Sequence, residues 1–140
     1  MLGSAMLRVL SRRDDLNIYG TLRSNKALIF LQPYIDKNNT FLNFDVTKNK
    51  DLEAIFSYVK PDLVINCIGL IKQVDESKNV LKAIEINSMF PHVLSKFCAN
   101  FNSKLIHFST DCIFSGAKGN YVECDLSDAE DLYGKTKYLG

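Results

Sequence analysis

Two side chains of complementary chemistry, Tyr133 and Lys137, lie four residues apart near the end of the 140-residue chain. A helix beginning near Asp131 would place the phenol and the amine on one face, one turn apart. A cation held beside a phenol stabilises the phenolate, so that the phenol can exchange a proton with a substrate oxygen near pH 7. Thr110, at the end of an apolar strand in the same sheet, would hydrogen-bond that oxygen. The spacing predicts a proton-transfer site.

The tyrosine and lysine pair carries little weight alone, because a chain with six tyrosines produces such a match easily by chance. The interpretation depends on an ordered set of features. An apolar strand over 104–109 ends in Ser-Thr-Asp, a loop containing glycine covers 116–131, and the pair then begins a helix.

The sequence Ser-Thr-Asp-Cys-Ile-Phe-Ser-Gly over 109–116, followed by Tyr-Gly-Lys-Thr-Lys over 133–137, resembles the extended short-chain dehydrogenase/reductase family. Within that family it is similar to the dTDP-4-dehydrorhamnose reductase branch, which carries Ser-Thr-Asp-x-Val-Phe-x-Gly, with Ile113 here in the Val position. Nucleotide-sugar epimerases of the superfamily carry Ser-Ser-x-x-Val-Tyr-Gly instead. Asp111 and Phe114 therefore favour the reductase branch.

The resemblance implies an NADP(H)-dependent reduction of a nucleotide-linked 4-keto-deoxysugar, of the kind used in dTDP-rhamnose and cell-surface polysaccharide biosynthesis. Tyr133 would protonate the developing alkoxide, and Thr110 would orient the carbonyl. Lys137 would assist Tyr133, and both residues would also contact the nicotinamide ribose. Asp111 and Asn87 are the candidate substrate-binding residues.

The first third of the chain supplies candidate cofactor-binding residues. The resemblance makes Gly3 the third glycine of a G-x-x-G-x-x-G turn, the one that permits close packing of helix and strand. Arg23 and Ser24 follow an expected strand over 16–22, where a basic residue accommodates the 2′-phosphate of NADP and an acidic one would bind NAD. NADP(H) is therefore favoured, with NAD(H) as the alternative. Asp45, at the end of an expected strand over 41–46, would meet the adenine.

The middle of the chain supplies a second cofactor-binding segment. The apolar run 62–67 is typical of a strand buried on both faces of a parallel sheet. It ends in Asn66, Cys67, Ile68 and Gly69, which resemble the Asn-Ala-Ala-Gly signature of the family, where small residues let the backbone approach the cofactor.

The remaining pattern alternates strands and helices, which predicts a doubly wound parallel α/β sheet of the Rossmann type. Helices are expected over 1–13, 47–60 and 77–102, and a short helix and loop over 25–39. Thr47 or Asn49 would cap the second helix, and Pro91 would bend the third or begin a new helix near Asn87. His107, inside the strand over 104–109, is expected to be a packed or backbone-bonded histidine. Two helical stripes are expected to be buried: Leu2, Met6, Val9 and Leu10; and Val80, Ile84, Met89, Val93, Leu94 and Phe97.

The resemblance extends over residues 1–140 and implies a partial dinucleotide-binding domain. The first strand with its two leading glycines, the later strands and a small C-terminal substrate domain would lie outside the chain. In the strand order of the family the missing strand is central. We therefore expect the chain by itself to be weakly stable and inactive, and the full-length protein to be the enzyme.

Composition narrows the choice of partners and compartment. A net charge of +1 gives no electrostatic reason to expect nucleic acid or an anionic membrane as a partner. No apolar run approaches the ~20 residues of a membrane span, and a cytoplasmic protein is expected. The four cysteines have no C-x-x-C spacing and accompany only two histidines, so we expect reduced thiols and no metal site.

Two other functions stay open. The same fold could serve a nucleotide-sugar epimerase or dehydratase, in which the cofactor is recycled within one turnover. The chain could also belong to a non-catalytic, nucleotide-binding regulatory subunit. A homodimer of the full-length protein is also open.

Overall fold

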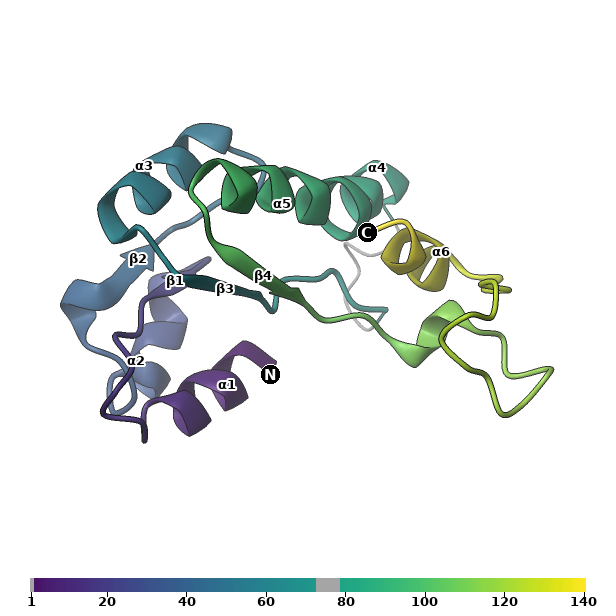
Figure 1. Ribbon diagram of the computed structural model, residues 1–140, viewed down its shortest axis with the longest axis horizontal. Helices are drawn as coiled ribbons and strands as arrows, with labels where there is room; N and C mark the ends of the chain where they lie inside the picture. The colour runs from purple at the N-terminus through teal and green to yellow at the C-terminus, as the bar shows by residue number, and fades with distance from the viewer. Residues whose placement is uncertain (1, 73–78) are drawn as a thin grey trace. The chain divides into compact units, whose positions relative to one another are not determined.

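The structure is a computed structural model that describes residues 2–72 and 79–140, without the side chain of residue 49. The chain divides into two compact units, residues 1–61 and 62–140. Each unit combines helices with one pair of parallel strands (Figure 1). The α/β class and the parallel strands predicted from the sequence are confirmed.

The first unit contains a two-stranded parallel sheet in which Gly20 lies opposite Thr40 and Leu22 lies opposite Leu42. Its core consists of apolar side chains from α2, α3 and the segments that flank β2: Leu28, Leu31, Ile35, Phe44, Leu52 and Phe56. In chain order its elements are α1 (Leu2–Leu10), β1 (Gly20–Leu22), a 3-10 turn (Asn25–Ala27), α2 (Leu28–Leu31), a 3-10 turn (Lys37–Asn39), β2 (Thr40–Leu42) and α3 (Asn49–Val59).

The strands of the first unit are shorter than expected. The carbonyl of Ile18 accepts a hydrogen bond from the Asn39 side chain at 3.2 Å, so the segment before Gly20 is held by a side chain instead of a neighbouring strand. Asn43 has a φ of 57°, a left-handed conformation that ends the extended β2.

The helices of the first unit also correct two expectations. On α1, Leu2 and Val9 are exposed and Met6 and Leu10 are only half-buried, so the predicted buried stripe is wrong. The N-cap of α3 is Lys48, without a side-chain cap, because the Thr47 hydroxyl donates to Asp45 at 2.8 Å instead.

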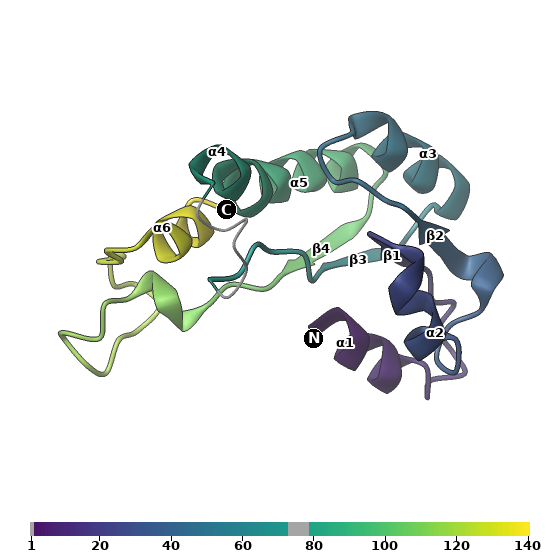
Figure 2. The ribbon, with the colours of Figure 1, turned by 180° about the vertical axis from the view of Figure 1, so that it is seen from behind.

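The second unit pairs β3 (Leu63–Asn66) with β4 (Lys104–His107) in parallel, with Leu63 opposite Lys104 and Asn66 opposite His107. Between the strands the chain forms α4 (Val80–Ala83), a π-helix (Ile84–Met89) and α5 (Phe90–Asn100) without interruption. Figure 2 shows α5 running along the strand pair, which it contacts at β4. After β4 come a 3-10 turn (Asp111–Ile113) and α6 (Leu132–Tyr138).

The π-helix changes which face of the 80–100 segment is buried. A π-helix bonds residue i to i+5, so the side chains after it are rotated relative to a continuous α-helix. Met89, the last residue of the π-helix, is exposed, and so are Val80 before it and Ile84 at its start, which corrects the predicted stripe; Leu94 is buried as expected. The buried positions of the π-helix are instead the polar Asn87 and Ser88.

Pro91 is the second residue of α5, directly after the π-helix. Regular α-helix resumes at Phe90 without a break, so the new helix expected near Asn87 is instead a change from π-helix to α-helix three residues later. The expected start of the region near residue 77 lies outside the described residues.

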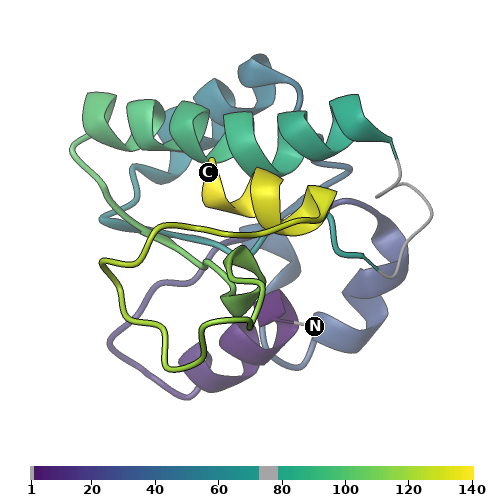
Figure 3. The same cartoon turned by 90° about the vertical axis from the view of Figure 1, so that its right-hand side faces the viewer.

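The C-terminal helix α6 packs beside α4 and the π-helix (Figure 3). Its N-cap is Asp131, whose carboxylate accepts from the Gly134 N–H at 2.9 Å. The helix therefore begins near Asp131, as predicted. The Ser88 hydroxyl donates to the Thr136 carbonyl at 2.8 Å. Asn87 donates to the Thr136 hydroxyl at 3.2 Å.

Asn87 provides a test of this packing. Its amide also donates to the Leu70 carbonyl and accepts from the Leu70 N–H, and the side chain is 1% exposed. Asn87→Ala would leave these buried backbone groups without partners, so we expect a loss of about 1–3 kcal/mol in the free energy of unfolding, measured by urea denaturation. The control Asn100→Ala, at the exposed end of α5, should change it by no more than about 0.5 kcal/mol. Equal effects of the two substitutions would show that the Asn87 contacts contribute nothing.

Candidate functional site

The carboxyl ends of β3 and β4 carry a side-chain pair that the strand register creates. Asn66 and His107 are the last residues of their strands and lie directly opposite each other. The Asn66 Nδ2 atom lies 2.9 Å from the His107 Nδ1 atom. The Asn66 Oδ1 atom accepts a hydrogen bond from the Ile68 N–H at 3.0 Å, and the side chain is 3% exposed. Asn66 therefore joins the two strand ends to the backbone that follows β3.

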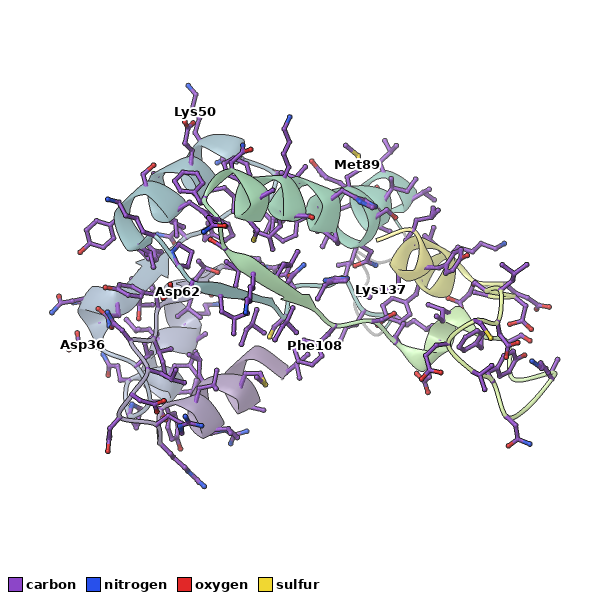
Figure 4. The ribbon with its side chains drawn as sticks, in the orientation of Figure 1. Asp36, Lys50, Asp62, Met89, Phe108 and Lys137 are labelled. Carbon is purple, nitrogen blue, oxygen red and sulfur yellow. The ribbon has the colours of Figure 1, made fainter. Side chains whose placement is uncertain are left out.

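Lys137 extends from α6 to the same strand end (Figure 4). Its Nζ atom donates to the Phe108 carbonyl at 2.8 Å and lies 3.1 Å from the His107 Nε2 atom. The residue is 6% exposed, and burial lowers the pKa of its amine. Burial also lowers the pKa of His107, and the adjacent Lys137 charge lowers it further. The amine that the sequence paired with Tyr133 is thus anchored on β4.

Thr110 lies two residues beyond the carbonyl that binds Lys137. It is the N-cap of the 3-10 turn, where its hydroxyl accepts from the Cys112 N–H and donates to the Asp111 carboxylate, both at 3.2 Å. The Thr110 hydroxyl thus already has local partners, while Asp111 is exposed.

Tyr133 lies in the first turn of α6 and is half-buried, with the Lys72 ammonium 5.7 Å from its ring centroid. Lys72 also forms an ion pair with Asp131 at 2.8 Å, and this pairing holds the pKa of Asp131 below its usual value. Lys72 was not predicted from the sequence, because its link to α6 spans 59 residues.

Gly134 lets α6 approach the turn that follows Thr110. A Cβ atom at this position would lie 2.2 Å from the Cys112 carbonyl oxygen and 2.8 Å from the Ala129 Cβ. Only a glycine permits this approach without displacing the helix that carries Tyr133 and Lys137. Gly134 was not predicted as a site residue, because the Tyr-Gly-Lys-Thr-Lys string carries no local signal of the contact with the Cys112 carbonyl.

The loop over 114–128 forms two open grooves beside the turn. One, of about 450 Å³, is lined by Asp111, Cys112, Phe114, Ser115, Gly116 and Tyr121. The other, of about 220 Å³, is lined by Lys72, Cys112, Phe114, Ser115, Ala129, Glu130 and Asp131. Phe114 stacks on Tyr121 with ring centroids 4.3 Å apart. Of the predicted site residues, only Asp111 lines either groove, whereas Thr110, Tyr133 and Lys137 line neither.

Asp128 organises this loop. Its carboxylate accepts from the Ser115 N–H at 2.7 Å, from the Ser115 hydroxyl at 2.6 Å and from the Tyr121 hydroxyl at 2.8 Å. These hydrogen bonds, led by that from the Ser115 hydroxyl, lower the pKa of Asp128 to about 2.

The remaining predicted residues of the second unit have distinct environments. Cys67 and Ile68 are half-buried and Gly69 is exposed, directly after β3. Asn87 is buried with both amide N–H groups in use, so in this structure it positions Leu70 and α6; its contact with substrate stays a prediction. His107 is half-buried and bonds to the side chains of Asn66 and Lys137, so of the two predicted environments it has the packed one and not the backbone-bonded one.

In the first unit the predicted cofactor residues follow parallel strand ends. Arg23 and Ser24 are exposed directly after β1, and Asp45 is half-buried three residues after β2. Since the strands are parallel and in register, their carboxyl ends share one edge of the sheet. Gly3 lies in the first turn of α1.

The four cysteines are free thiols: Cys67, Cys98, Cys112 and Cys124. Among the described residues, no group of three or more His, Cys, Asp or Glu side chains is placed to hold a metal ion. Within residues 2–72 and 79–140, no helix has the length and apolar character that a membrane span requires.

Solved structures with the same fold define the class. A hypothetical dTDP-4-dehydrorhamnose reductase from Sulfolobus tokodaii superposes with a TM-score of 0.75 at 25% identity, over 99% of this chain and 48% of that one. A dTDP-4-dehydrorhamnose reductase from Bacillus anthracis, solved in complex with NADP, superposes with a TM-score of 0.68 at 21% identity, over 86% and 46%. The fold is therefore of the Rossmann type.

The sequence itself identifies the family. Residues 1–140 match the family described as the RmlD substrate binding domain. The dTDP-4-dehydrorhamnose reductase of Aggregatibacter actinomycetemcomitans is 30% identical over 101 residues, which cover 71% of this chain and 34% of that protein. The chain belongs to the RmlD family of extended short-chain dehydrogenases/reductases, as the motif resemblance indicated, and spans about a third of the length of this curated relative.

Substitution of Gly134 tests the close approach of α6. In an unconstrained helix, alanine is more favourable than glycine by about 1 kcal/mol. Here we expect Gly134→Ala to lower the free energy of unfolding by about 1–3 kcal/mol, because the new methyl group overlaps the Cys112 carbonyl. Lys135→Ala, at the next and exposed position of α6, is the control and should be nearly neutral. A stabilising effect of Gly134→Ala in thermal unfolding would contradict the predicted contact.

Titration of Asp128 tests the order of the loop. Its pKa is about 2 in the folded chain and ~3.9 in an unfolded one, so its contribution to stability is present above pH ~4 and is lost as the pH falls toward 2. Carboxyl-detected NMR of Ser115→Ala should show the Asp128 pKa raised toward the ordinary value. Ser127→Ala, which removes a bond to the Ile113 carbonyl, should leave it near 2. An ordinary pKa in the unaltered chain would disprove the network.

Proposed function

We propose that the protein containing this chain is an NADP(H)-dependent reductase of a nucleotide-linked 4-keto-deoxysugar, similar in activity to the dTDP-4-dehydrorhamnose reductases. The proposal is carried by the position of the Lys137 amine. It bonds to the Phe108 carbonyl after β4, two residues before Thr110. On α6, Lys137 lies one turn after Tyr133. Membership of the RmlD family supplies the substrate class.

The proposed reaction reduces the C4 carbonyl of the sugar to an alcohol. The reduced nicotinamide, when bound, supplies the hydride. The Tyr133 hydroxyl gives its proton to the substrate oxygen as the carbonyl bond becomes single, and solvent restores the proton to Tyr133. Thr110 and Asp111 lie at the carboxyl end of β4, where they would orient the sugar.

The residues present fit a dinucleotide. In open α/β sheets, ligands bind beyond the carboxyl ends of the strands. In the first unit, Arg23, Ser24 and Asp45 follow such ends, and in the second Asn66 to Gly69 do so. The exposed Arg23 favours the 2′-phosphate of NADP over NAD. The NADP bound to the Bacillus anthracis reductase supports the same choice.

The proposed activity belongs to a protein with the length of these relatives. The 140 residues alone are expected to be inactive. A homodimer and a cytoplasmic location stay predictions from the sequence.

Replacement of the tyrosine hydroxyl tests the proposal. In the longer protein, Tyr133→Phe should lower kcat for NADPH oxidation with dTDP-4-dehydro-L-rhamnose by about 10²–10⁴-fold, because it removes the proton donor. The control Tyr138→Phe alters an exposed tyrosine of the same helix and should retain activity. The 140-residue chain, assayed in parallel, should show no turnover.

The assay also separates the alternatives. Undiminished turnover by Tyr133→Phe would eliminate the proton-donor role. Sugar conversion without net NADPH oxidation would indicate an epimerase or dehydratase. A stoichiometric protein partner without sugar turnover would indicate a regulatory subunit.

A further inference from the structure

Lys72 joins the segment that follows β3 to the first turn of α6. Its ammonium forms an ion pair with the Oδ2 atom of Asp131 at 2.8 Å. The Oδ1 atom of the same carboxylate caps α6 by accepting from the Gly134 N–H at 2.9 Å. One carboxylate therefore both begins the helix and holds the ammonium beside it.

The backbone that carries Lys72 is also held in place. Two residues earlier, the Leu70 N–H donates to the Asn87 side chain at 2.7 Å, and the Leu70 carbonyl accepts from that side chain at 3.0 Å. Leu70 and Asn87 are both buried. The lysine side chain therefore extends from a fixed segment of backbone to a fixed carboxylate.

This placement puts a positive charge against the ring of Tyr133, two residues after the helix cap. The Lys72 ammonium lies 5.7 Å from the ring centroid, within the ~6 Å at which an aromatic face attracts a cation. The hydrogen bond to Asp131 raises the pKa of Lys72, so the amine carries its charge at neutral pH. Lys137 lies one turn later on α6, where its amine bonds to the Phe108 carbonyl.

A cation against the ring has its largest effect when the ring is negatively charged. When Tyr133 gives its proton to the substrate oxygen, its O–H bond breaks, the O–H bond of the product alcohol forms, and a phenolate remains. The phenolate charge spreads into the ring, so a nearby ammonium attracts it more strongly than it attracts the neutral phenol. An interaction that strengthens as the proton leaves lowers the barrier to its transfer.

We propose that Lys72 is a positioning residue for proton transfer from Tyr133: its ammonium, held by Asp131, orients the ring and stabilises the phenolate that the transfer leaves behind. This inference rests on the proposed function, in which Tyr133 is the proton donor. It adds a second cation, from the segment after β3, to the Lys137 cation of α6.

The alternative is a surface ion pair without a further role. The side chains of Lys72 and Asp131 are 46% and 50% exposed, and pairs of this kind add little to stability. Replacement of Lys72 should therefore leave the protein folded under either interpretation. The two interpretations differ in turnover, because a surface ion pair has no effect on proton transfer.

The first experiment measures turnover of the longer protein with an uncharged side chain at position 72. Lys72→Met should lower kcat for NADPH oxidation with dTDP-4-dehydro-L-rhamnose by about 3- to 30-fold, in the range of a cation–π contact. Lys72→Arg keeps a cation and should retain at least about a third of the activity. Lys135→Met, which removes an exposed cation of α6, should leave kcat unchanged. Full turnover by Lys72→Met, or an effect on KM alone, would overturn the proposal.

The second experiment asks whether Lys72 acts through the phenol. Tyr133→Phe keeps the ring but forms no phenolate. Adding Lys72→Met to that variant should therefore leave its residual kcat, measured in single turnovers, unchanged within about twofold. An equal fold-loss from Lys72→Met with and without Tyr133→Phe would overturn the proposal, because the lysine would then act independently of the phenol.

The third measurement does not depend on the reaction. The hydrogen bond from Lys72 is the main reason for the lowered pKa of Asp131. In carboxyl-detected NMR of the longer protein without ligands, Lys72→Met should therefore raise the Asp131 pKa, whereas Lys72→Arg and Lys135→Met should leave it low. An Asp131 pKa that stays low in Lys72→Met would overturn the placement of Lys72.

The three measurements separate failure of this inference from failure of the proposed function. Full turnover by Tyr133→Phe, together with a raised Asp131 pKa in Lys72→Met, would remove the proton-donor role and leave the placement of Lys72 intact. Impaired turnover by Tyr133→Phe, together with full turnover by Lys72→Met, would overturn this inference alone.

Discussion

The arrangement of the second unit depends on one buried contact, the hydrogen bond from the Lys137 amine to the Phe108 carbonyl. A buried amine without a partner would cost several kcal/mol, so α6 is held where its lysine can reach the end of β4. The two elements joined by this bond carry Tyr133 on one side and Thr110 on the other. The contact therefore positions the groups proposed to act on the substrate.

Two further features make that contact geometrically possible. Gly134 removes the side chain that would separate α6 from the Cys112 carbonyl. The π-helix turns the polar Asn87 and Ser88 toward α6, where both bond to Thr136. A regular α-helix would present a different face. The helix is thus held by paired polar groups as well as by apolar packing, which fixes its register along its axis.

The candidate site differs from the arrangement expected for the family in its use of polar side chains. Asn66 and Asn87, both expected near cofactor or substrate, point inward and organise the backbone around β3 and α6. The open grooves of this unit are lined instead by the loop over 114–128 and its flanking segments. Lys137 of α6 contacts His107 at the end of β4.

Much of the site could be read from local sequence. A helix start near Asp131, Tyr133 and Lys137 one turn apart, and a Ser-Thr-Asp strand end are short-range features, because helical spacing involves neighbours within four residues. The alternation of strands and helices likewise indicated parallel α/β pairing before any coordinates were known.

What the sequence by itself determined was therefore the class of fold, the family and the order of the reactive groups. The tertiary structure decided which polar groups meet. The bonds of His107 to Asn66 and Lys137 join residues 41 and 30 positions apart; the first exists because of the strand register, and the second because α6 reaches the end of β4. Contacts between distant segments also determine the strand lengths, the change of helical phase at the π-helix and the need for Gly134. Local sequence patterns carry no information about such contacts.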